Sequence, residues 1–450
     1  MIKVAQLVPL VVAVGWWLLV ATRWWGGRGA GAATGGAILS AVALLALRPH
    51  MVLPQPAIWL AMWLSCAALV VAAEAPTGWA GAENAADYVA FGWTVVAVAA
   101  AIARERRIVE VILALVVLGV MVEFAEGWVA WWGGEDPTRP MLGTFYWWDP
   151  FAAYLIPGSL IGYGVWLRER GAPTVLGLGG FVLGSIGLVY STSRAADAVF
   201  VVALILVTVT QAFGGWAVLR RVVVALLIGG LAVWAVGGPP FFPHRVQPLS
   251  ATSARGSGQS LSQNGHYRTE FWREALGVFS RHPLFGGGYH SLATESVGHA
   301  PAGWSLSPLA HSGYLQALSD GGLILAVPFL LCCVGIGLIV LISLVSAMRR
   351  RDFSVTGFVV PLALGGLLAH SAIDFDWTYP ADFLLVAILS GIVLGRWATE
   401  RQARVAGRRL TACAVLVGVV TLGIAAGAAW SGDLRLSLPV GHSAADGSAR

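Results

Sequence analysis

The chain has 450 residues, of which 57% are hydrophobic and only 11% are charged, and its net charge is +5. A soluble protein of this length carries about a quarter charged residues, so the composition excludes a soluble multi-domain enzyme. Apolar runs of about 18 or more residues recur along the whole chain, each long enough to cross a ~30 Å hydrocarbon core. We therefore predict an all-α polytopic membrane protein with about 12–13 transmembrane helices. The small net charge gives no indication of a nucleic-acid partner.

Thirteen apolar runs are predicted to span the membrane. They lie near residues 4–20, 30–47, 51–73, 85–103, 108–128, 149–167, 174–190, 196–214, 222–236, 322–345, 355–373, 381–397 and 410–430. Basic residues cluster in every second short loop, for example at Arg106 and Arg107 and again at Arg349 and Arg350. The positive-inside rule places these loops in the cytoplasm. The sequence therefore predicts a multi-pass protein of the cytoplasmic (inner) membrane with a cytoplasmic N-terminus.

This topology divides the chain into five parts. The N-terminal transmembrane helices occupy residues 1–128, and transmembrane helices that carry outer-face motifs occupy residues 129–236. A large extracytoplasmic loop covers residues 237–321, the C-terminal transmembrane helices cover residues 322–430, and a polar tail covers residues 431–450.

The sequence shows no pattern for a metal or a cofactor. The four cysteines, Cys66, Cys332, Cys333 and Cys413, all lie in apolar runs and have no CxxC spacing. Such cysteines are most simply small apolar side chains. The Gly286–Gly288 run lacks the lysine and the strand–helix context of a phosphate-binding loop. We therefore predict no metal site and no cofactor.

Two helical patterns are predicted in the large outer loop. Apolar residues recur at a spacing of 3.6 residues over Tyr267–Phe279, where Arg268 and Trp272 share one face. A second pattern runs over His311–Asp320, with His311 and Tyr314 on one stripe, and Gly321 and Gly322 break it. We expect both amphipathic helices to lie flat on the outer membrane surface.

Several polar residues on the outer side have an ordinary interpretation when each is taken alone. Arg194 closes the seventh span and can simply extend its side chain towards water, or it can bind an anion. Arg268 can be a solvated charge, and His311 can be an ordinary surface histidine. Asp374 and Asp376 can belong to a polar turn, or they can bind an acceptor sugar or orient Arg194.

Taken together, the loop motifs carry a family resemblance. The motifs Arg268-x-x-x-Trp272, Pro283-Leu-Phe-Gly-Gly-Gly-Tyr289 and His311-Ser-x-Tyr-Leu-Gln-x-Leu-x-Asp-Gly-Gly322 follow one another in one loop. This order resembles the bacterial O-antigen ligase and polysaccharide polymerase family. The segments Thr192-Ser-Arg194 and Gly143-Thr-Phe-Tyr-Trp-Trp-Asp149 match two further family motifs, so that the resemblance covers about residues 140–395.

The chain departs from the family pattern at three positions. Ser312 and Asp149 stand where asparagine is frequent, and Asp320 stands where glutamate is common.

The resemblance implies a metal-independent glycosyltransferase on the extracytoplasmic side of the membrane. The donor would be an oligosaccharide on undecaprenyl pyrophosphate, and the acceptor a hydroxyl of another glycan. Arg194 and Arg268 take the family's pyrophosphate-binding positions, and His311 takes the position of the catalytic base. Supporting positions fall on Trp272, Tyr314, Asp320, Asp374 and Asp149. The resemblance also implies the lipid bilayer, a flippase and a chain-length regulator as partners.

The chemistry of these residue types fits the implied reaction. Guanidinium groups bind phosphate oxygens through two parallel hydrogen bonds, so arginines can stabilise a leaving pyrophosphate. A sugar hydroxyl is a poor nucleophile and needs a base within hydrogen-bond reach, and histidine can accept that proton near neutral pH.

Three functions stay open at the level of sequence. The first is a polymerase that extends a lipid-linked polysaccharide, which we favour because one lysine among 28 basic residues indicates a GC-rich genome of the kind found in bacteria without lipopolysaccharide. The second is a ligase that moves the finished glycan to a lipid, cell-wall or protein acceptor, since both reactions share the donor. The third is a transporter, but the nearly uncharged spans and the absence of paired broken helices argue against transport.

Overall fold

A computed structural model describes most of the chain from residue 55 onward. The described ranges are 55–77, 81–104, 107–133, 140–145, 147–212, 215–237, 261–301, 306–400 and 408–437, with a few positions between 37 and 44. Within these ranges every regular element is a helix. Ten of these helices are long and apolar enough to cross a membrane. The prediction of an all-α polytopic membrane protein is therefore confirmed.

The ten long helices correspond to ten of the predicted spans. They are α4 Gln55–Glu74, α5 Ala82–Arg104, α6 Arg107–Gly133, α7 Trp148–Arg168, α8 Ala172–Ser191, α9 Arg194–Ala212, α10 Trp216–Gly237, α13 Gly313–Arg350, α15 Pro380–Glu400 and α16 Arg408–Ser437. The predicted run 355–373 appears as a π-turn, η4 Val355–Val359, continued by the short helix α14 Val360–His370. The predicted run 4–20 and most of 30–47 lie outside the described residues.

The boundaries agree with the predicted spans to within five residues, except at the start of α10, the end of α16 and, most of all, in α13. This helix begins at Gly313, and the predicted run 322–345 covers only its inner part. The four cysteines lie on α4, α13 and α16 as free thiols.

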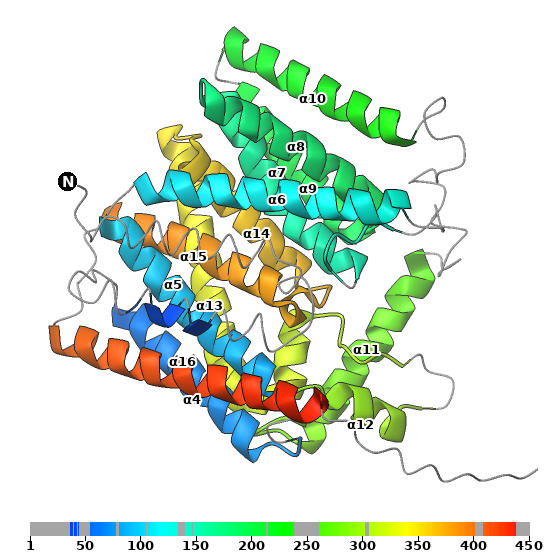
Figure 1. Ribbon diagram of the computed structural model, residues 1–450, viewed down its shortest axis with the longest axis vertical. Helices are drawn as coiled ribbons and strands as arrows, with labels where there is room; N and C mark the ends of the chain where they lie inside the picture. Colours follow the sequence, from blue (N-terminus) through cyan, green and yellow to red (C-terminus); the bar gives the residue numbers. More distant parts are fainter. Residues whose placement is uncertain are drawn as a thin grey trace, which may run out of the picture.

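Two groups of helices meet at the centre of the molecule. The helix α5 packs against α15, α4 and α16, and α7 packs against α8, α9 and α14 (Figure 1). The three helices α5, α7 and α15 are almost entirely buried, whereas α10 lies at the edge and leaves most of its surface exposed. Gly162 of α7 and Gly177 of α8 let the two backbones touch, because a Cβ on either would lie 2.6 Å from the carbonyl oxygen of the other.

The long loop between α10 and α13 contributes two helices that lie together at one end of the long helices. These are α11 Leu261–Arg281 and α12 Ser291–His299 (right-hand side of Figure 1). The predicted pattern over 267–279 is confirmed as part of α11. The helix α12 was not predicted, because its nine residues bury only one large apolar side chain, Leu292, and show no apolar spacing.

A glycine-rich turn fixes α11 against a break in α13. Gly287 and Gly288 donate their N–H groups to Ser319 and Asp320 O at 2.9 and 3.0 Å, and Leu323 N bonds Pro283 O at 2.9 Å. Gly322 breaks the helix with φ 54° and ψ −154°, a conformation that residues with a Cβ rarely adopt. The motifs Pro283–Gly288 and Asp320–Gly322 are therefore two sides of one backbone joint.

Candidate active site

His311 lies just before α13 and not within a helix. Its φ of 48° is left-handed, and Ser312 is the N-cap residue of α13. The prediction that the helix begins at His311, on one stripe with Tyr314, is therefore wrong. The imidazole stacks on Phe271, with ring centroids 5.2 Å apart, and meets the edge of Phe375 at 4.6 Å. These contacts hold the ring between α11 and the segment that follows α14.

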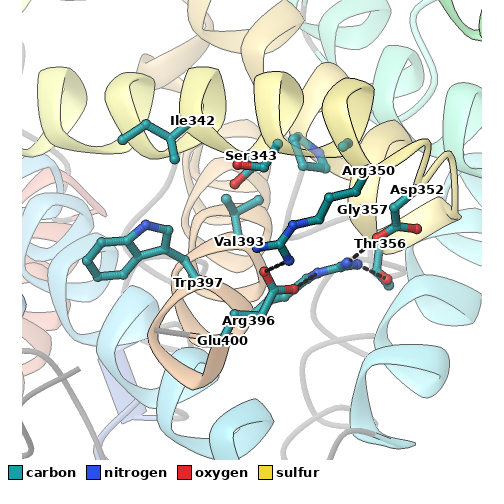
Figure 2. Close-up of a pocket in the computed structure, with 13 residues that line it drawn as sticks. Ile342, Ser343, Arg350, Asp352, Thr356, Gly357, Val393, Arg396, Trp397 and Glu400 are labelled. Atoms are coloured by element: carbon teal, nitrogen blue, oxygen red, sulfur yellow. Dashed lines mark hydrogen bonds and ion pairs between the residues drawn. The ribbon is translucent and has the colours of Figure 1, made fainter. Parts of the chain in front are cut away.

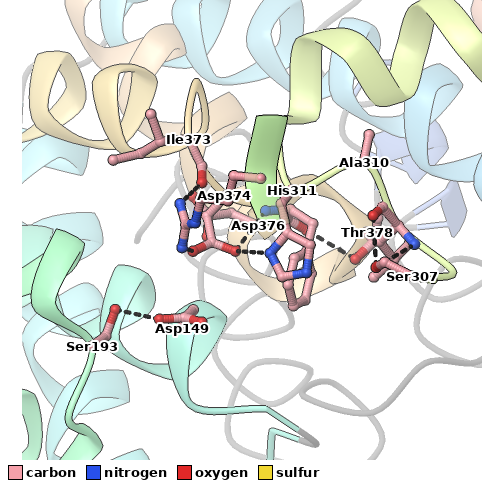
Figure 3. A network of polar contacts seen from close by, with 12 residues as sticks. Asp149, Ser193, Ser307, Ala310, His311, Ile373, Asp374, Asp376 and Thr378 are labelled. Atoms are coloured by element: carbon pink, nitrogen blue, oxygen red, sulfur yellow. Dashed lines mark hydrogen bonds and ion pairs between the residues drawn. The ribbon is translucent and has the colours of Figure 1, made fainter. Parts of the chain in front are cut away.

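Asp374 joins His311 to Arg268. Its Oδ1 lies 3.7 Å from Nδ1 of His311, and its Oδ2 lies 3.0 Å from Nη2 of Arg268 (Figure 3). Arg268 also donates from Nη1 to the carbonyl oxygen of Ile373. The 3.7 Å contact is longer than a hydrogen bond, so Nδ1 of His311 has no hydrogen-bond partner in this state.

The Asp374 carboxylate is fully buried but remains charged. Burial by itself raises the pKa of this carboxyl group, but His311 and the positive charge of Arg268 outweigh burial and hold the pKa at about 2. An isolated carboxylate in such a place would be very unfavourable, so the ion pair with Arg268 is required for the arrangement to exist.

The backbone around His311 is held from both sides. Trp272 donates from Nε1 to the carbonyl oxygen of His311 at 3.2 Å. On the other side, Gln316 accepts from the N–H of Ala310 at 2.8 Å and donates to Asp320 at 2.9 Å. Asp320 therefore does not reach the imidazole but fixes the residue that holds the preceding backbone.

Tyr314 connects the start of α13 to the end of α14. Its hydroxyl donates to Leu368 O at 2.9 Å, and its ring meets the ring of Trp377 at 80° with centroids 4.6 Å apart. Like Asp320, Tyr314 supports the backbone of the site, and its side chain bonds Leu368 and not His311.

Asp149 and Arg194 lie on the other side of the same region. Ser193 donates to Oδ1 of Asp149 at 2.5 Å, and Figure 3 shows this pair opposite Asp374. Arg194 follows directly as the first residue of α9, partly exposed and without an ion pair within the described ranges. The carboxylate of Asp374 pairs with Arg268, so the suggestion that it orients Arg194 is not supported.

The structure thus brings Arg268, Trp272, His311 and Asp374 into direct contact. Sequence reasoning missed Phe271, Gln316 and the Ile373 carbonyl. Phe271 could have been found because it belongs to the apolar pattern of α11. Gln316 could have been found because it lies inside the His311 motif. The role of the Ile373 carbonyl could not have been found from the sequence, because every residue has a backbone carbonyl.

A small cavity lies at the opposite end of α13 and α15. Its volume is about 60 Å³, and Arg350, Asp352, Arg396 and Glu400 line it (Figure 2). Arg396 forms two ion pairs there, at 2.6 Å from Asp352 and 2.7 Å from Glu400. This cluster is an ion-pair joint between the helix ends and is separate from the His311 site.

Within the described ranges no three His, Cys, Asp or Glu side chains are placed to hold a metal ion. Metal independence itself stays a prediction.

The comparison with known proteins gives one match. Residues 179–330 match the family model described as O-antigen ligase, and no curated protein matches the chain. The matched segment contains Arg194, Arg268, Trp272 and His311, and it ends before Asp374. The resemblance drawn from the motifs is thereby confirmed over residues 179–330, the segment in which the chain is similar to the O-antigen ligase family.

Proposed function

We propose that the chain transfers a glycan from undecaprenyl pyrophosphate to an acceptor sugar hydroxyl on the extracytoplasmic face of the cytoplasmic membrane, as a polysaccharide polymerase. The observation that carries this proposal is the convergence of His311 and Arg268 on one buried carboxylate, Asp374. The proposed base and a cation thereby contact the same carboxylate.

In this mechanism His311 is the base that activates the acceptor. When its Nδ1–H faces Asp374, its Nε2 carries a lone pair that can accept the proton of the hydroxyl group. The acceptor oxygen forms a bond to the anomeric carbon while the bond from that carbon to the pyrophosphate oxygen breaks. The pyrophosphate leaves with the bonding electron pair, and the hydroxyl proton goes to His311.

Arg194 and Arg268 are proposed to stabilise the leaving pyrophosphate. Arg194 has no ion pair within the described ranges, so its guanidinium is available to an anion. Arg268 uses two of its N–H groups on Asp374 and Ile373 and retains others, since a guanidinium has five. Charge that develops on the pyrophosphate oxygens would meet donors that are already oriented.

The depth of the site fits a lipid-linked anion. The helices α7 and α9 have 21 and 19 residues, and they are joined at their other ends by the 2.5 Å bond between Arg168 and Gln211. At ~1.5 Å per residue their lengths are about 28–31 Å, close to the ~30 Å hydrocarbon core. We therefore propose that Asp149 and Arg194, at the site ends of these two helices, lie near the level of the lipid headgroups.

The orientation in the membrane can be tested directly. In a cysteine-free background, a cysteine at Ser280 on the exposed side of α11 should react with an impermeant thiol reagent in intact cells. A cysteine at Arg349, at the far end of α13, should react only after the membrane is opened. The reverse pattern would place the site in the cytoplasm and remove the proposed mechanism.

Lipid-linked glycans from a deletion strain separate the candidate reactions. A strain without the polymerase should retain single repeat units on the lipid carrier, whereas a strain without a ligase should retain long polymer on it. When the deletion strain is complemented with a His311→Asn variant, the same lipid-linked glycan should accumulate as in the deletion strain itself. If the glycan pattern does not change in either strain, the proposal fails and transport becomes the leading function.

A further inference from the structure

A second histidine–aspartate pair lies directly behind the Asp374 carboxylate. Nδ1 of His370 lies 2.7 Å from Oδ2 of Asp376, and the hydroxyl of Ser371 donates to the same oxygen at 2.9 Å. All three side chains are at most 1% exposed. The pair links the two ends of the turn formed by residues 370–376 on its buried side. Asp374 lies within that turn.

The turn is bonded to the backbone that presents His311. The N–H of Gly313 donates both to Ser371 O at 2.8 Å and to Asp374 O at 2.9 Å. A Cβ on Gly313 would lie 2.8 Å from the ring of Trp377, so this close approach requires glycine. Only Ser312 separates Gly313 from His311, and the position of the turn therefore sets the position of the imidazole.

The turn also orients the carboxylate of Asp374. The N–H of Phe375 donates to Oδ1 of Asp374 at 2.9 Å, and the Phe375 ring meets the imidazole of His311. If the turn moves, Asp374 moves relative to His311, and the 3.7 Å contact between them lengthens or shortens.

We infer that His370 and Asp376 are positioning residues that set the distance between His311 and Asp374. This inference rests on the proposed function. Neither residue touches the space in front of His311, since both are fully buried behind the turn. They act through two backbone bonds to Gly313 and through the orientation of Asp374.

Kinetics of the purified chain in lipid nanodiscs test this inference, with the lipid-linked glycan of the deletion strain as donor. Asp376→Asn keeps the shape of the side chain but weakens its bonds to His370 and Ser371. Because an error of about 1 Å in such a geometry costs about 100-fold, we expect kcat to fall by about 10- to 100-fold. The KM for the donor should stay within about twofold, since the donor-binding arginines are unchanged.

The matched control is Asp382→Asn. Asp382 is also fully buried and lies six residues further along, but its carboxylate has no hydrogen-bond partner in the turn. It should keep kcat within about threefold, which excludes a general effect of removing a buried carboxylate. His370→Asn, which retains a donor near Nδ1, should keep more activity than His370→Ala. Ser371→Ala removes a single bond and serves as the milder variant if Asp376→Asn does not fold.

A double-mutant cycle separates positioning from simple stability. In the Asp374→Asn background, Asp376→Asn should cause no further loss of residual turnover. Asp376 acts by setting the distance between His311 and the Asp374 carboxylate, and that carboxylate is already absent. An equal additional loss in both backgrounds, at equal amounts of folded protein, would overturn the inference. If Asp376→Asn and Ser371→Ala keep the wild-type kcat while Asp374→Asn is inactive, the inference about His370 and Asp376 is wrong but the proposed function is not affected. Wild-type kcat in Asp374→Asn would overturn the proposed function as well.

Discussion

Nη2 of Arg268 lies 3.0 Å from Oδ2 of Asp374, and this ion pair joins α11 to the segment between α14 and α15. Arg268 is 26% exposed on its side chain, whereas Asp374 is fully buried, so the pair connects the solvent side with the interior. The same guanidinium bonds the carbonyl oxygen of Ile373. Arg268 therefore performs a structural task and keeps part of its charge accessible.

Arg268→Lys should lose most activity although the charge is retained. One ammonium group cannot contact Ile373 O, Asp374 and a phosphate oxygen with the geometry of a planar guanidinium. We expect kcat/KM for the lipid-linked donor to fall by about 100-fold. The matched control is Arg273→Lys, which changes an exposed arginine on the same helix and should leave turnover within about twofold. Equal activity in the two variants would limit Arg268 to its structural ion pair with Asp374 and exclude a role in donor binding.

The Arg268–Asp374 pair should lose its stabilising effect only in strong acid. The pKa of Asp374 is about 2 in the folded protein, below the ordinary value of 3.8, because His311 and Arg268 outweigh the opposite effect of burial. A lowered pKa stabilises the fold at every pH above the unfolded value, and this contribution disappears as the pH falls from about 4 to about 2. Thermal unfolding of wild type and Asp374→Asn should therefore differ by a constant amount, roughly 5 °C, between pH 8 and pH 5. The difference should shrink below about pH 4. A difference that disappears near pH 6 would mean that another group carries the effect.

The transmembrane part of the fold could be predicted because each span is encoded locally. An apolar run of about 20 residues has few alternatives to a helix in a bilayer, so ten predicted spans match ten long helices. The helix α12 escaped prediction because its nine residues are held by tertiary packing around Leu292 and not by their own periodicity.

The site could be predicted as a set of residues but not as a geometry. The motifs around Arg268 and His311 identified two members, and the family resemblance gave Asp374 as a supporting residue. No local pattern indicates that Asp374 pairs with Arg268 and not with Arg194, since these contacts join segments far apart in the chain. The left-handed backbone of His311 was also hidden, because Ser312 and not His311 caps the helix.

Gly322→Ala should destabilise the joint between the outer loop and α13. A Cβ on Gly322 would lie 2.6 Å from Leu284 O, and the residue already has φ 54°. Strain of this kind costs about 1–3 kcal/mol before the clash is counted. We expect a lower apparent Tm in detergent and less folded protein in the membrane. Gly335→Ala on the same helix meets open space and should be neutral or slightly stabilising. Equal stability of the two variants would contradict the tight joint.

His311→Asn should abolish turnover while the protein remains folded and binds its donor. Asparagine tolerates the left-handed backbone of residue 311, which alanine does not, so it removes the imidazole without adding backbone strain. The bond from Trp272 goes to the carbonyl oxygen of His311 and survives the substitution.

An asparagine amide cannot accept a proton at neutral pH, and loss of a general base costs about 10²- to 10⁴-fold in kcat. The measurement is turnover of lipid-linked glycan in nanodiscs, together with donor binding and apparent Tm. His311→Gln, which can form a hydrogen bond with the acceptor but cannot take its proton, should be as inactive as His311→Asn. Substantial activity in His311→Gln, combined with loss of wild-type turnover in the presence of a chelator, would exclude His311 as the base and require a metal-dependent mechanism.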